Sequence, residues 1–181
     1  MDTIAHFLWG SGLGKISRDK FKKNFSWVWT GLWAVFPDLL AFGIAIAYAV
    51  LFLGQIHGPH FITDVLYPIS HSFLVFGVVF LAVFAVKRRF YLAMLGWPLH
   101  ILFDIFTHTS DFYPTPFLWP LVETSLDGVK WSNPVFMVLN YVVLIGLLVY
   151  AFWDELKKMF GKIQERLDMY ETPDEIGKRS I

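Results

Sequence analysis

The sequence predicts an all-α, polytopic helical membrane protein. We expect about four spans, a short N-terminal half-helix and a C-terminal amphipathic helix. Of the 181 residues, 56% are hydrophobic and 17% are charged, which is more apolar than a soluble domain of this size. Long apolar runs also alternate with short basic clusters, as spans alternate with turns. We therefore expect one membrane domain over residues 1–153 and a charged cytoplasmic tail over residues 154–181.

The first stretch, residues 1–14, is apolar but too short to cross a bilayer, which takes roughly 20 residues. A basic cluster between Lys15 and Lys23 follows it, so we expect a half-helix that descends into a basic turn. A signal peptide is not expected. Asp2 and His6 interrupt the apolar stretch, and the basic residues come after it rather than before it.

Four longer apolar runs are the predicted spans. They cover residues 25–53, 72–86, 90–107 and 135–153. The first contains Pro37, and because proline removes a helical hydrogen bond, we expect a local break there. The connection over residues 54–70 contains glycine and proline and predicts a loop or a pair of short pieces, and residues 110–134 predict a long, proline-rich connection.

The basic residues lie on one side of the predicted spans. They gather at residues 15–23, at residues 87–89 and in the tail from Lys157, whereas Lys130 is the one basic residue in the two other connections. The positive-inside rule places the basic turns in the cytoplasm. We expect an integral protein of the prokaryotic inner (plasma) membrane, with both termini on the cytoplasmic side.

The tail predicts an amphipathic helix that lies on the membrane surface. Its apolar residues recur at helical spacing, and Pro173 is expected to end the helix. A cytoplasmic protein partner is one expected use of this helix, beside contact with membrane lipid. No nucleic-acid partner is expected, because the basic residues sit between apolar runs and form no basic, aromatic surface.

An apolar run over residues 95–111 carries three ionisable side chains. His100, Asp104 and His108 are four residues apart, and on a helix each such step turns by only about 40°. The three side chains therefore form one stripe. Ionisable groups inside a membrane span are costly, usually face the bundle interior and mark a functional site.

Further polar residues are expected at the height of this stripe. With a rise of about 1.5 Å per residue, Asp38 stands roughly 20 Å above the basic cluster and His100 roughly 16 Å above Arg89. The expected site opens towards the outer half of the bilayer. The candidate metal ligands are His6, Asp38, His71, His100, Asp104 and His108.

The chemistry of this set predicts a divalent metal. The chain has no cysteine, so the set offers imidazole nitrogen and carboxylate oxygen, which suit Zn²⁺, Mn²⁺ or Fe²⁺; we expect zinc. One metal, or two that share an aspartate, both fit the sequence. Such a site can activate water for ester or phosphoester hydrolysis. Asp104 is expected either to bind the metal or to act catalytically, by orienting His100 or activating the water.

The order of the short motifs resembles the membrane-bound metal-dependent hydrolase family, also described as LexA-binding, inner-membrane-associated hydrolases. The motifs are His6, Pro37-Asp38, His71-Ser72, His100-Ile-Leu-Phe-Asp104 with Thr107, and Pro116-Phe-Leu-Trp-Pro120. The chain departs from the family where Leu40 replaces a second aspartate. The resemblance implies a metal-dependent hydrolase that uses the matching histidines and aspartates.

The resulting hypothesis is hydrolysis of an ester or phosphoester in a lipid or lipid-linked substrate. An ion or proton transporter is the first alternative, in which the same residues relay protons. An accessory structural subunit is the second, in which His100 and Asp104 brace two helices and Asp38 caps the helix after Pro37. In that last case His108 would be a hydrated residue at the membrane surface.

Overall fold

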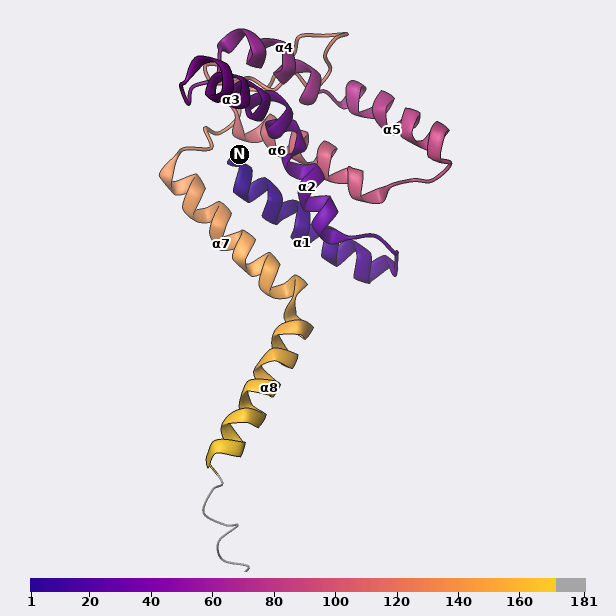
Figure 1. Ribbon diagram of the computed structural model, residues 1–181, viewed down its shortest axis with the longest axis vertical. Coiled ribbons are helices and arrows are strands. Elements are labelled where there is room, and N and C mark those ends of the chain that lie inside the picture. Colours follow the sequence, from indigo (N-terminus) through magenta and orange to yellow (C-terminus); the bar gives the residue numbers. More distant parts are fainter. Residues whose placement is uncertain (172–181) are drawn as a thin grey trace, which may run out of the picture.

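The structure, a computed structural model described over residues 1–171, is a bundle of helices from which the last helix projects (Figure 1). The described residues contain no strand, which confirms the predicted all-α class. The elements are α1 (Thr3–Phe21), α2 (Trp27–Asp38), η1 (Leu39–Gly43), α3 (Ile44–Tyr48), η2 (Ala49–Leu53), α4 (His60–Ser70), α5 (Phe73–Lys87), η3 (Leu92–Leu95), α6 (Gly96–Thr107), α7 (Pro134–Ala151) and α8 (Trp153–Glu171).

Two helical stretches are long and apolar enough to cross a membrane, namely residues 27–53 and 134–151. They indicate association with a membrane. A third span exists if α4 and α5 count as one helix that is bent by 66°. The predicted number of four spans is therefore confirmed only in part. The predicted spans over residues 72–86 and 90–107 correspond to α5, which has 15 residues, and to the short apolar helix Leu92–Thr107. Ser72 caps α5, with its hydroxyl accepting from the backbone N–H groups of Leu74 and Val75.

The first span does not break at Pro37, contrary to the prediction. Pro37 lies inside α2, and the helix continues into the π-helical stretch η1. Proline has no N–H to donate, and a wider π-helical turn absorbs such a disruption without ending the helix. One carbonyl in this region, that of Ala34, accepts a hydrogen bond from the His100 side chain at 2.7 Å.

The N-terminal helix is longer than the predicted half-helix. It begins after Asp2, whose carboxylate accepts from the backbone N–H of Ala5 at 2.9 Å, and it runs through most of the basic cluster to Phe21. Lysine and arginine are good helix formers, and Lys15 pairs with Asp19 one turn further on. The basic residues therefore extend the helix instead of ending it.

Close backbone contact holds α1, α2 and α6 together. A Cβ atom on Gly31 of α2 would overlap the Ser11 hydroxyl of α1. A Cβ atom on Gly96 would overlap the carbonyl oxygen of Thr30. Because these glycines have no side chain, α1 and α6 can each approach the backbone of α2 closely. This packing brings the N-terminal end of α1 next to α6.

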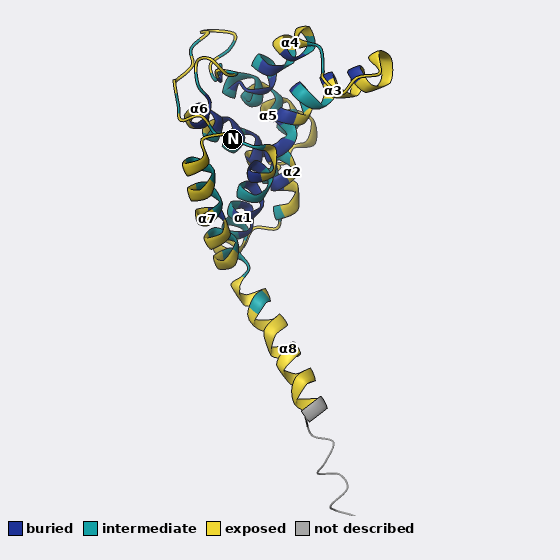
Figure 2. Cartoon of the chain, turned by 90° about the vertical axis from the view of Figure 1, so that its left-hand side faces the viewer, coloured by how far each residue is buried: buried dark blue, intermediate teal, exposed yellow. Residues whose placement is uncertain are grey.

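The two long connections differ. Residues 60–70 of the first form helix α4, in keeping with the predicted short pieces, whereas residues 108–133 contain no helix, as predicted. The predicted tail helix is present as α8, which is almost wholly exposed and extends away from the bundle (Figure 2). Pro173, the predicted end of this helix, lies outside the described residues.

Lys15 joins α1 to the start of α8. Its ammonium group is buried and lies 2.9 Å from the Glu155 carboxylate, in addition to its contact with Asp19. Burial opposes the charge, but the hydrogen bonds to Asp19 and Glu155 prevail and raise the pKa of Lys15 above its ordinary value. The hydrogen bond from Lys15 in turn lowers the pKa of Glu155.

We expect Lys15→Met to free α8 from α1, because the variant keeps the apolar stem but loses the charge. Two spin labels can be attached to cysteines introduced into α1 and α8, since the chain has no cysteine of its own. Their distance distribution should broaden in the variant. The exposed Lys157, changed to methionine, is the control, and an unchanged distribution in Lys15→Met would contradict the anchoring role.

The same contact should weaken in acid. A carboxylate whose pKa is lowered by folding stabilises the folded contact above its unfolded pKa and loses that effect as the pH falls through the lowered value. The distance distribution of the wild-type chain should therefore broaden below about pH 4 and stay narrow at neutral pH. The Lys15→Met variant should show no such transition.

Candidate metal centre

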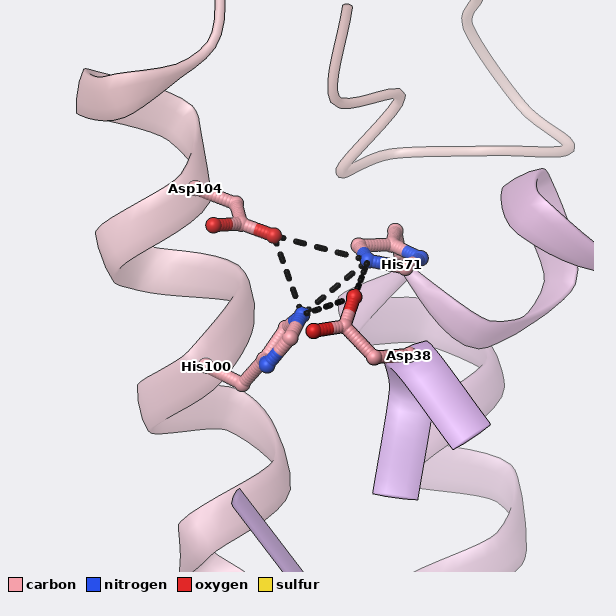
Figure 3. Close-up of side chains that lie close together, drawn as sticks. All are labelled: Asp38, His71, His100 and Asp104. Carbon is pink, nitrogen blue, oxygen red and sulfur yellow. Dashed lines mark hydrogen bonds and ion pairs between the residues drawn. The ribbon is translucent and has the colours of Figure 1, made fainter. Parts of the chain in front are cut away.

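Four side chains from three parts of the fold meet inside the bundle (Figure 3). Asp38 ends α2, His71 follows α4, and His100 and Asp104 lie one turn apart on α6. One ligand atom from each lies within 4.8 Å of all the others. The group can hold a metal ion.

The distances fit a tetrahedral site. The two Nε2 atoms of His71 and His100 are 3.0 Å apart, and Asp104 Oδ2 lies 3.5 and 2.9 Å from them, respectively. Asp38 Oδ1 lies 3.8 Å from His71 Nε2 and 3.7 Å from His100 Nε2. A tetrahedral zinc site with bonds of 2.0–2.1 Å has edges of about 3.3–3.4 Å, close to the middle of this range.

Both histidines contact a backbone carbonyl through Nδ1. His100 Nδ1 lies 2.7 Å from the Ala34 carbonyl oxygen, and His71 Nδ1 lies 3.1 Å from that of Tyr67. A carbonyl oxygen can only accept, so a proton on each Nδ1 satisfies these two contacts. His71 Nδ1 also lies 2.8 Å from the Ser70 hydroxyl, which can donate or accept. With the proton on Nδ1, each Nε2 directs its lone pair at the centre, as a metal-binding imidazole does.

The centre consequently contains acceptors that face one another in a dry interior. His71, His100 and Asp104 are fully buried, and Asp104 Oδ2 has no hydrogen-bond donor among the described residues. Lone pairs and carboxylate oxygens at these distances repel unless a cation lies between them. The donor set of two imidazoles and two carboxylates fits a divalent ion such as Zn²⁺, Mn²⁺ or Fe²⁺.

The N-terminal residues 1–6, which include the start of α1, fix the two carboxylates. The Thr3 hydroxyl donates to Asp38 Oδ2 at 2.7 Å, and His6 Nε2 lies 2.9 Å from Asp104 Oδ1. The Met1 amino group also donates to Asp104 Oδ1, at 2.5 Å, and to the Thr107 hydroxyl. In each aspartate one oxygen binds the protein, which leaves the other facing the histidines.

All six predicted ligands lie in this region, but two lie outside the group of four. The His6 ring stacks on His100 at 3.7 Å, and His6 Nδ1 has no hydrogen-bond partner among the described residues. His108 Nε2 lies 3.5 Å from Asp104 Oδ1, and His108 Nδ1 lies 2.8 Å from the Tyr113 carbonyl. Both histidines thus face the second oxygen of Asp104, and their role as ligands stays a prediction.

The sequence analysis missed the residues that support the histidines. Tyr67 stacks on His71 at 3.8 Å, and its hydroxyl lies 3.0 Å from His108 Nδ1. The indole of Trp97 donates to the Ser70 carbonyl at 2.6 Å, which ties α6 to the residue before His71. The spacing of Tyr67 and His71, one helical turn, could have indicated that the tyrosine packs on the histidine. Nothing in the sequence distinguished Thr3 as a residue that contacts Asp38.

We expect His71→Ala and Asp104→Asn to abolish stoichiometric metal binding by the purified protein, because each removes a ligand. Metal content measured by plasma mass spectrometry tests this. Thr3→Val removes a positioning hydrogen bond and should weaken metal affinity by about 10–100-fold. The exposed His60 on α4, changed to alanine, is the control. Wild-type metal content in His71→Ala would rule out this centre.

Comparison of the sequence and structure with known proteins identifies no related protein. No family model, no curated protein and no solved structure matches the chain. The resemblance to membrane-bound metal-dependent hydrolases therefore stays a prediction from the motifs, and the functional argument rests on the geometry of the centre.

Proposed function

We propose that this protein is a membrane-embedded metal-dependent hydrolase that cleaves an ester or phosphoester in a lipid or lipid-linked substrate. The observation that carries the proposal is the pair of buried histidines whose Nε2 lone pairs face each other and two carboxylates at 2.9–3.8 Å. Pairs that merely brace helices are joined by shared protons. Here the Nδ1 atom of each histidine contacts a backbone carbonyl, and with the proton on Nδ1 the atoms that face one another are all acceptors.

The four residues of the centre would hold the metal. A divalent ion bound there would act as a Lewis acid and supply a nucleophilic water at neutral pH. Asp38 Oδ1, His71 Nε2 and His100 Nε2 are assigned as ligands. Asp104 has a double role in this proposal, since Oδ2 faces the metal position while Oδ1 accepts from His6.

His108 is the proposed proton acceptor. With its proton on Nδ1, donated to the Tyr113 carbonyl at 2.8 Å, His108 keeps a basic Nε2 that lies 3.5 Å from Asp104 Oδ1. A neutral imidazole next to the centre can accept a proton from the attacking water, a contribution that is typically 10²–10⁴-fold in rate. Tyr67 positions this ring through its hydroxyl, 3.0 Å from Nδ1.

The surroundings of the centre favour an apolar substrate. Asp38 is the member that solvent reaches, with 11% of its side chain exposed, whereas His71 and His100 are fully enclosed. The next residue along the chain, Leu39, exposes an apolar side chain on a candidate membrane span. A substrate would therefore approach past Asp38 from the apolar side, as a lipid can.

Activity assays on the purified protein in lipid nanodiscs test the proposal. We expect metal-dependent release of acid or phosphate from ester or phosphoester substrates, and loss of both metal and activity in His71→Ala. His108→Ala should keep the metal and lose 10²–10⁴-fold in rate. His60→Ala should behave as the wild type.

Two results would argue against hydrolysis. If the metal-loaded protein turns over neither esters nor phosphoesters but carries ions or protons across liposomes, the transporter alternative gains support. If His108→Ala keeps its full rate, the assignment of the proton acceptor is wrong, even if the metal centre is correct.

A further inference from the structure

Two adjoining cavities lie at the opposite end of α1 from the metal centre. One, of about 460 Å³, is lined mainly by apolar side chains of α1, η3 and α6, among them Leu13, Leu95 and Leu99. The other, of about 560 Å³, lies between the turn that follows α1 and the turn that follows α5. The linings share Lys23, and both volumes fall within the range of ligand-binding pockets.

The second cavity carries two basic side chains. Lys23 and Arg89 line it from two turns that are far apart in the sequence, and neither cavity has a carboxylate in its lining. No ion pair joins either residue to a carboxylate within residues 1–171. Two uncompensated cations on one cavity favour an anion, and the arginine fork matches phosphate in particular.

The polarity changes from one cavity to the next. The basic cavity also contains Trp29, Trp33 and Tyr91, and Trp29 is 59% exposed. Tryptophan and tyrosine are the side chains that favour the headgroup level of a bilayer. The first cavity, by contrast, is lined by leucine and phenylalanine, together with Gly14, Ser17, Thr30 and Lys23. Such a gradient matches a ligand with one charged and one apolar end.

We propose that an anionic phospholipid binds at this end of the bundle. Its phosphate lies on Lys23 and Arg89, and one acyl chain enters the leucine-lined cavity beside Leu95. Neither cavity is lined by Asp38, His71 or His100, so this lipid is bound and not cleaved. The proposal is independent of the proposed hydrolase function.

Lipid retention by the full-length protein tests the site. The protein is incubated with vesicles of dioleoyl-phosphatidylcholine, with or without dioleoyl-phosphatidylglycerol, extracted gently and examined by native mass spectrometry. We expect saturable retention of one phosphatidylglycerol per chain and no comparable retention of phosphatidylcholine. The double variant Lys23→Gln, Arg89→Gln should weaken retention by about 30-fold, from two basic contacts.

A matched control separates a site from general charge. Lys158→Gln with Lys162→Gln removes the same charge from the exposed helix α8 and should leave retention unchanged. Equal losses in both double variants, or equal retention of the two lipids, would overturn the proposal. The metal content of each variant reports whether its bundle is intact.

Competition distinguishes a lipid from free phosphate. Inorganic phosphate and short-chain dihexanoyl-phosphatidylglycerol should both compete poorly with the long-chain lipid if the acyl chain occupies the first cavity. Competition by inorganic phosphate as strong as that by the long-chain lipid would show a simple phosphate site and overturn the assignment to a lipid.

Discussion

The complete burial of the Asp104 carboxylate is the constraint on which the rest of the structure depends. A lone carboxylate in a dry interior is costly, so its surroundings must neutralise it. On one side, the Met1 amino group and His6 of α1 contact Oδ1. On the other side, Oδ2 faces the Nε2 atoms of His71 and His100, where a bound cation would complete the neutralisation. The helices that bring these groups together are the core of the protein.

The glycines in the middle of the bundle allow the helices that surround Asp104 to approach closely. Contact between α1 and α2 near Gly31, and between α2 and α6 near Gly96, sets the height at which the N-terminal end of α1 meets α6. Thr3 and His6 reach the aspartates because the backbones are this close. The close packing of the backbones is therefore a condition for the contacts that hold the aspartates of the centre in place.

The sequence predicted the helical class and the residues that converge. Ionisable side chains in apolar helices are costly to expose to lipid, so they are expected to face one another inside the bundle. His100 and Asp104 followed from their four-residue spacing, and Asp38 from its place after Pro37. Three features were predicted incorrectly because opposing local signals act at the same positions. They are the continuation of the helix past Pro37, the length of α1 and the bend at His71, which reduced the number of full-length spans. The supporting carbonyls of Ala34 and Tyr67 are backbone atoms and carry no signature of their own.

The unbroken length of α1 has a mechanical consequence. One end of this helix touches the aspartates of the metal centre through Thr3 and His6, and the other half is tied to the projecting α8 through Lys15. Thr3 and His6 at the aspartates and Lys15 at α8 therefore lie on one continuous helix, so the centre inside the bundle and the projecting tail share a single rigid element.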